Sequence, residues 1–157
     1  TYRTPGPDGL PMRSTISWLA AAQRVRFDGV GSGGYMLLDR RSGRGWHVVP
    51  ADRRVTELPE ESARRMLSNY DGRDFVRLGG DRVAGVDCTV WRFTVRDRTL
   101  TACLGSEGVV LRSQGGGMRP EDVVEAVAVT FGRQDPARFD PPAYPPPQAP
   151  SRPGRWN

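Results

Sequence analysis

The chain has 157 residues, of which 19 are Gly and 14 are Pro, and it carries a net charge of +5. This length fits one domain with or without a tail, and it excludes a TIM barrel, a kinase, or a Rossmann domain with a partner domain. The Gly and Pro content is typical of short strands joined by turns, and no apolar run approaches the roughly 20 residues of a membrane span.

The basic residues number 23, and all of them are Arg. They are scattered along the chain, often beside Asp or Glu, whereas a nucleic-acid interface gathers basic residues on one face together with aromatic side chains. The absence of Lys from the whole chain is better explained by codon bias than by the needs of one site. We therefore expect no nucleic-acid partner.

The first half of the chain predicts an antiparallel meander. An apolar segment at 14–20 is followed closely by 24–28, where apolar and polar residues alternate, which indicates a hairpin. The Gly-rich segment 29–34 resembles a phosphate-binding loop, but such a loop leads into a helix and this one leads into a strand, so a hairpin loop is predicted. Further strands are predicted at 35–39, 46–49 and 54–58.

One helix is predicted, beginning near Pro59. Proline suits the first helical turn, and the acidic residues after it complement the positive end of the helix dipole. Apolar side chains then recur with helical spacing at Ala63, Met66, Leu67 and Tyr70. This stripe must pack on the sheet.

Three consecutive strands are predicted in the second half, at 90–95, 100–104 and 109–113. A turn at Asp97-Arg98 sets Val95 opposite Leu100. In this register one face of the three strands is entirely apolar and the other is polar, which indicates a sheet with one buried face. The apolar face includes Trp91, Phe93, Ala102, Leu104, Val109 and Leu111.

The two cysteines, Cys88 and Cys103, lie on the polar face of this register, with Cys103 opposite Arg92. A disulfide needs Cα atoms within about 7 Å, so a bulge or a longer loop would have to correct the offset. Two buried thiols are the alternative. The cysteines form no C-x-x-C pair, and the single His47 does not complete a zinc site with them, so neither a metal nor a cofactor is expected.

Catalytic motifs are missing. His47 has no Ser in a G-x-S-x-G turn to activate, and its place between Trp46 and Val48 in a strand predicts a half-exposed structural residue. The neighbouring carboxylates Glu60 and Glu61 are explained by the start of the helix. We expect no enzymatic activity.

The C-terminal part predicts one more element and a tail. Segment 123–131 mixes helix and strand signals, and its alternation favours a final strand. From residue 140 onward the chain has seven prolines in 18 residues, which predicts a Pro-rich tail at 140–157 after a domain at 1–139. The chain opens at Thr1 without a Met, as it would after removal of a secretory signal or after trimming.

Several short motifs resemble bacterial envelope proteins whose fold is similar to the lipoprotein carriers LolA and LolB. They are Gly85-x-x-Cys88-Thr89-x-Trp91 and Glu107-Gly108-Val109-x-Leu111, with Ala102–Leu104, Tyr35–Asp39 and Phe139–Pro142. The resemblance implies a mainly β fold: a strongly curved antiparallel sheet, or half-open barrel, with one or a few short helices over its concave face. It also implies a periplasmic or secreted protein with an incomplete first strand, and it keeps the Cys88–Cys103 disulfide open as an alternative to two thiols.

The concave face of the carriers holds acyl chains, so the resemblance implies a lipid or another apolar ligand here. The expected ligand-binding residues are Met66, Leu67, Trp91, Phe93, Leu104, Val109 and Leu111. The alternative is a protein-interaction or sensor module of the envelope, in which the same residues serve only as core. In that case an edge strand or the Pro-rich tail would bind another envelope protein or a second copy, and the protein would be peripheral to the membrane at most.

Overall fold

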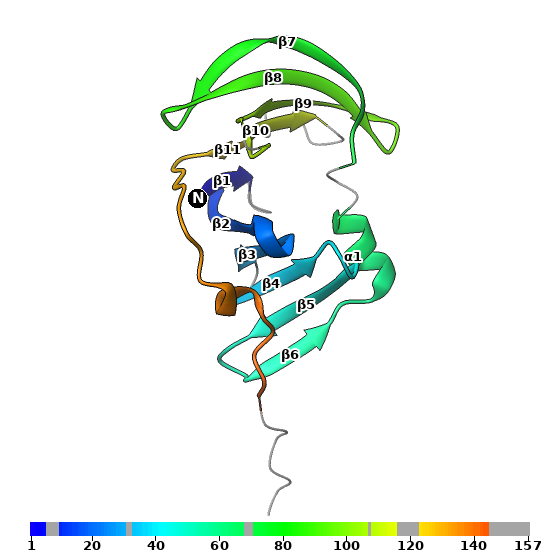
Figure 1. Ribbon diagram of the computed structural model, residues 1–157, viewed down its shortest axis with the longest axis vertical. Coiled ribbons are helices and arrows are strands. Elements are labelled where there is room, and N and C mark those ends of the chain that lie inside the picture. Colours follow the sequence, from blue (N-terminus) through cyan, green and yellow to red (C-terminus); the bar gives the residue numbers. More distant parts are fainter. Residues whose placement is uncertain (6–9, 31–32, 68–70, 107, 116–122, 145–157) are drawn as a thin grey trace, which may run out of the picture.

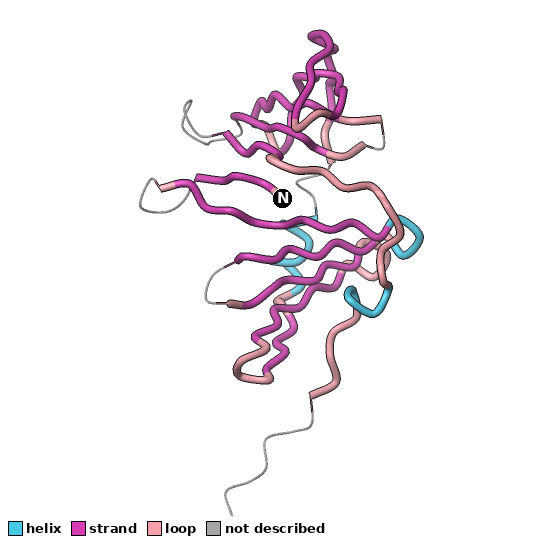
Figure 2. Tube along the Cα trace, turned by 90° about the vertical axis from the view of Figure 1, so that its left-hand side faces the viewer, coloured by secondary structure: helices cyan, strands magenta, loops and turns pink. Residues whose placement is uncertain are grey.

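A computed structural model describes residues 1–5, 10–30, 33–67, 71–106, 108–115 and 123–144. Their strands form one antiparallel sheet of eleven, in the order β6-β5-β4-β3-β2-β1-β11-β10-β9-β8-β7 (Figure 1). The sheet curves strongly along its length (Figure 2) and does not close, so that β6 and β7 are its two edges. The predicted fold class, a curved antiparallel sheet with a short helix, is confirmed.

The predicted meander forms the first half of the sheet. Each strand from β1 to β6 pairs with the next one along the chain, so this turn-rich part of the sequence folds into consecutive hairpins. Leu37, Leu38 and Val48 are almost completely buried and form the core of this half. The strands are β1 (Tyr2–Pro5), β2 (Pro11–Leu19), β3 (Arg24–Val30), β4 (Gly34–Asp39), β5 (Arg44–Val49) and β6 (Arg54–Glu57).

The single α-helix, α1 (Glu60–Leu67), packs on β5. Ala63 is fully buried, and a Cβ on Gly45 would lie 2.7 Å from the Leu38 Cδ2 and 2.9 Å from the Leu58 Cδ1, so the glycine makes room for the side chains packed between strand and helix. Met66 and Leu67, in the last turn, are half-buried. Tyr70, the last residue of the predicted stripe, lies outside the described residues.

The second half of the sheet contains a long strand that the sequence reading did not predict, β7 (Arg73–Val83). Charged residues and the Gly79-Gly80 pair interrupt its apolar run, and two irregularities in its pairing with β8 break the simple alternation that marks a strand. The other strands are β8 (Val86–Val95), β9 (Arg98–Leu104), β10 (Val110–Gly115) and β11 (Val123–Ala126).

The predicted register of β8 and β9 was wrong by two residues. The turn is Arg96-Asp97, where both residues have positive φ (46° and 61°), and Val95 pairs with Arg98. These are the backbone angles that a tight two-residue hairpin requires. Because the shift is an even number of residues, Trp91, Phe93 and Leu104 stay on one face as predicted.

The second hairpin, β9 with β10, also differs from the prediction. A bulge between Val110 and Arg112 sets Ser113, rather than Leu111, opposite Ala102. Leu104 already pairs with Val110 instead of Val109, and the bulge adds a second position, so Leu111 leaves the predicted row. Leu111 is fully buried in a cluster with Cys88 and Cys103 instead.

The chain after β11 returns along the sheet to β3. The predicted final strand at 123–131 ends at Ala126, since the N–H groups of Val127 and Ala128 bond to the carbonyl oxygen of Thr1. A short 3₁₀ turn, Pro136–Phe139, then contacts β3, and Phe139 is only 1% exposed. No helix among the described residues is long and apolar enough to cross a membrane.

Candidate binding surface on the β7–β8 hairpin

The edge strand β7 exposes large apolar side chains. Phe75, Val76 and Leu78 are 48%, 44% and 52% exposed, and nearly every residue of the strand before Val83 faces solvent. On one side β7 pairs with β8, and its other side has no neighbouring strand in the described sheet (Figure 1). A long, exposed, apolar edge is a typical site for pairing with another chain.

Aromatic rings gather on one face of the hairpin. Phe75 stacks on Phe93, with centroids 4.8 Å apart and planes inclined by 18°, and it meets Trp91 edge to face at 6.1 Å. An open depression of about 560 Å³ lies beside them and includes Leu104 in its wall. Offset and edge-to-face aromatic pairs stabilise such an arrangement.

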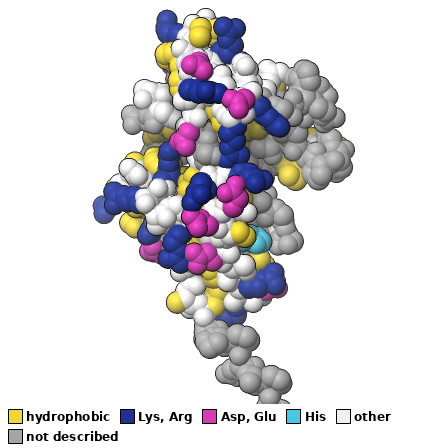
Figure 3. All heavy atoms as spheres, turned by 90° about the vertical axis from the view of Figure 1, so that its right-hand side faces the viewer, with side chains coloured by type: hydrophobic (Ala, Val, Ile, Leu, Met, Phe, Trp, Pro, Cys, Tyr) yellow, Lys and Arg dark blue, Asp and Glu magenta, His cyan; other side chains and the backbone are white. Residues whose placement is uncertain are grey.

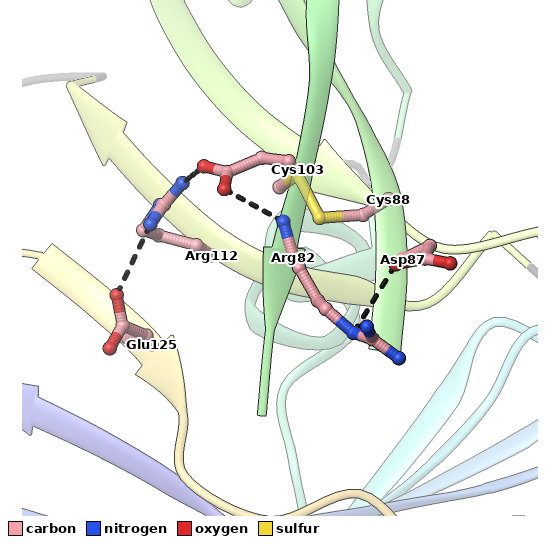
Figure 4. The surroundings of a disulfide bond; sticks show 7 residues. Arg82, Asp87, Cys88, Cys103, Arg112 and Glu125 are labelled. Carbon is pink, nitrogen blue, oxygen red and sulfur yellow. Dashed lines mark hydrogen bonds and ion pairs between the residues drawn. A yellow bond between two sulfur atoms is a disulfide. The ribbon is translucent and has the colours of Figure 1, made fainter. Parts of the chain in front are cut away.

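Ion pairs lie along the same hairpin, and the pairs around Asp81 and Arg112 are on the face opposite the aromatic rings, since these two residues pair with Cys88 and Cys103. Asp81 accepts bonds from the backbone N–H of Arg82 and from the Arg112 guanidinium, and these two interactions, in that order, lower its pKa. Arg112 also lies 3.6 Å from Glu125, while Arg82 extends to Asp87 (Figure 4). Basic and acidic side chains are interspersed over the face shown in Figure 3, which matches their scatter along the sequence.

The two cysteines form a disulfide between β8 and β9 (Figure 4), with their Cα atoms 5.5 Å apart. The corrected register explains the bond, because Cys103 pairs with Val90 rather than with Arg92 and so lies diagonally beside Cys88. Both residues are buried, at 8% and 2% exposure, in the cluster that contains Leu111. The face predicted to be purely polar is therefore buried at this end of the sheet.

The expected ligand-binding residues divide into three groups. Trp91, Phe93 and Leu104 share the face just described, and all three are half-buried. Leu111 is buried in the disulfide cluster, and Val109 packs against that cluster. The remaining two lie at the end of α1.

Of these two, Leu67 lines a separate depression of about 400 Å³ between α1 and the turn of β4 and β5. The walls of that depression carry paired charges, including Arg44 with Glu57 and Arg64 with Glu60. An apolar ligand would find little complementary surface there.

The apolar residues of β7 are the part of the surface that the sequence reading missed. The run Phe75-Val76-x-Leu78 is the signal that could have found them, since it is a short apolar stretch between charged residues and a Gly pair. His47 lies in β5 opposite Met36 and is half-buried, as predicted. Within the described ranges, no group of three His, Cys, Asp or Glu residues could hold a metal ion.

No protein-family model matches this sequence, and no curated protein matches it. Among solved structures, it is similar to MucB (16% identity, TM-score 0.52), to the MucA/MucB complex of Pseudomonas aeruginosa (14%, 0.53) and to MucB in complex with MucA(peri) (15%, 0.53). Each likeness covers 90% of this chain and between 53% and 57% of the other. At this level of identity the likeness shows the fold, and this chain spans little more than half the length of the MucB chains.

Proposed function

We propose that this chain is a non-catalytic module of the bacterial cell envelope that binds another protein through the open β7 end of its sheet. The observation that carries the proposal is the eleven-residue edge strand with Phe75, Val76 and Leu78 exposed. Exposed apolar surface of this kind is typical of an interaction site. The likeness to MucB in two complexes with MucA supports it, because the same fold binds a protein there.

An exported location is supported by the Cys88–Cys103 disulfide. Disulfides persist in the periplasm and outside the cell, whereas the cytosol keeps thiols reduced. The resemblance to envelope carriers leads to the same compartment. We therefore place the protein in the periplasm or among secreted proteins, peripheral to the membrane at most.

A non-catalytic role agrees with the surroundings of the residues that were candidates for chemistry. His47 pairs across the sheet with Met36 and Thr56, and its side chain makes no hydrogen bond or ion pair with a residue that the structure describes, so no described acid orients it as a base. The cysteines are bonded to one another, so neither is a nucleophilic thiolate. Binding without covalent chemistry is the simplest use of this surface.

A second candidate function is the binding of a lipid or another apolar ligand. The depression of about 560 Å³ beside Phe75, Trp91 and Leu104 favours it, since its volume lies in the range of small-molecule sites. Burial of an acyl chain there would contribute about 0.8 kcal/mol per CH₂. Phe93 belongs to the same face, whereas Met66, Leu67, Val109 and Leu111 would have no direct part in it.

Native mass spectrometry of the protein recovered from the envelope of producing cells tests both candidates. The proposal predicts a complex in which the chain carries the additional mass of one other protein. The same complex should form again when the two purified proteins are mixed. Phe75→Ser with Leu78→Ser should lower its occupancy at least tenfold, while Phe131→Ser, a change at a residue 58% exposed outside β7, should leave it unchanged. An adduct of lipid mass that Trp91→Ala removes would support the second candidate, and a bare chain would contradict both.

A further inference from the structure

We propose that the partner of β7 is an extended segment with acidic side chains, which adds to the sheet as a twelfth strand. This inference rests on the proposed function, and it specifies the mode of binding and the chemistry of the partner. Strand addition of this kind obtains affinity from main-chain hydrogen bonds and specificity from alternate side chains. The edge, its charges and its apolar residues each bear on the proposal.

The two edges of the sheet differ in how they are protected. β6 has only four residues, and the charges along it are paired, Glu57 with Arg44 at 2.6 Å and Arg54 with Asp52 at 3.4 Å. β7 has eleven residues, enough for a partner strand of ordinary length. A short, charged edge resists pairing, whereas a long edge with apolar side chains invites it.

Two arginine side chains at the β7 end have no acidic partner among the described residues. Each of its aspartates lies within ion-pair distance of an arginine: Asp74 and Asp97 share Arg73, Asp87 lies beside Arg82, and Asp81 beside Arg112. The side chains of Arg77 and Arg92, in contrast, make no ion pair or hydrogen bond with any residue that the structure describes. Two exposed guanidinium groups beside an apolar edge favour a partner that brings carboxylates.

The register places these arginines on opposite faces of the sheet. Arg77 pairs with Trp91, on the face of the aromatic rings, and Arg92 pairs with Val76, on the other face. Side chains of an added strand alternate between the two faces. The partner should therefore carry two acidic residues an odd number of positions apart, with an apolar residue between or beside them for the depression near Phe75.

A second copy of this chain fits the edge poorly. β7 carries three arginines and two aspartates, so a second β7 strand would bring further net positive charge to a chain that already carries a net charge of +5. Like charges across neighbouring strands destabilise the pairing. Charge thus selects an acidic partner over a homodimer.

Titration of the purified, oxidised chain with two end-capped ten-residue peptides tests the inference. One peptide carries two Glu residues three positions apart among Val, Thr and Phe residues, so that they lie on opposite faces of an added strand, and the other carries Lys in place of both. Fluorescence polarisation should show at least tenfold tighter binding of the Glu peptide. When this peptide is added, the backbone amide signals of the protein that shift in NMR spectra should be those of residues 73–83 in β7 and not those of residues 54–57 in β6.

Variants then assign the charges. Arg77→Glu with Arg92→Glu should abolish or reverse the preference for the Glu peptide. Arg13→Glu, at an exposed arginine of β2 whose side chain also makes no ion pair or hydrogen bond with a described residue, should leave that preference unchanged apart from a small general effect. Equal binding of both peptides, shifts centred on β6, or dimerisation of the chain through β7 would each overturn the inference. A protein partner recovered by native mass spectrometry would still uphold the proposed function in those cases, so the two failures are distinguishable.

Discussion

Removal of the Cys88–Cys103 disulfide should cost a large part of the stability of this fold. The cysteines are 15 positions apart, and a cross-link that closes a loop of this length stabilises the folded state by about 3 kcal/mol. Replacing both with Ala also removes buried sulfur atoms beside Leu111, which adds about 1 kcal/mol. The expected loss is large beside the total of about 5–15 kcal/mol for a typical domain.

Urea unfolding followed by Trp fluorescence measures this loss. The oxidised protein, the protein reduced while unfolded and then refolded in reductant, and Cys88→Ala with Cys103→Ala are compared. The difference between the oxidised and the reduced protein measures the contribution of the cross-link alone. The double variant additionally loses the buried sulfur atoms, and reductant should not change its stability. A difference of less than about 1 kcal/mol between the oxidised and reduced proteins would refute the reasoning, because the bond would then constrain little of the unfolded chain.

Three further changes test the packing and charge of the fold. Phe139→Ala should lower the free energy of unfolding by about 3–5 kcal/mol in urea, because the side chain is only 1% exposed; a loss below about 1 kcal/mol would contradict its place in the core. Gly34→Ala should cost about 1–3 kcal/mol by the same assay, since the new Cβ would lie 2.6 Å from a carbonyl oxygen of β5; wild-type stability would show that the strands separate freely. Burial raises the pKa of Asp39, but hydrogen bonds from backbone N–H groups and from Arg24 outweigh it, so the folded-state pKa lies below its usual value of 3.8. Its stabilising contribution is therefore complete above that value and is lost as pH falls through the folded-state pKa, and the stability difference between wild type and Asp39→Asn should vanish in acid; a difference independent of pH would contradict this.

The hairpins of the first half were predictable from sequence because their signals are local. Alternation in 24–28 and the Gly-rich segment at 29–34 determine strand and turn without reference to distant residues. The helix was predictable for the same reason, and its last described residue, Leu67, falls within the predicted stripe. Local signals thus predicted an antiparallel β fold and the hairpins of the first half, whereas the strong curvature was implied by the resemblance to the envelope carriers.

The register of the second half was harder, because two nearby turn positions compete. Asp97-Arg98 and Arg96-Asp97 both suit a two-residue turn, and they differ by a shift that keeps every side chain on its face. The apolar pattern therefore could not choose between them. The proximity of Cys88 and Cys103 depends on that choice, which is why the disulfide stayed undecided at the sequence level.

Contacts between distant segments were beyond the sequence patterns. Phe139 lies at the end of the predicted domain, and its burial depends on the return of the chain to β3, where Arg26 donates a hydrogen bond to the carbonyl oxygen of Arg138. Nothing in the local sequence specifies that return. The candidate surface shows the same limit: Trp91 and Phe93 were predicted from their alternation, whereas Phe75 joins them only through the irregular pairing of β7.

Photo-crosslinking in producing cells tests the central claim, protein binding at β7, most directly. A photoreactive phenylalanine analogue is placed at Leu78 on β7 or, as the control, at Phe131, two side chains with similar exposure of 52% and 58%. The account predicts that the Leu78 position links to one protein, which then binds the purified chain and loses that binding with Phe75→Ser. A folded, exported chain that gives no protein adduct at Leu78, or the same adducts at both positions, would contradict it.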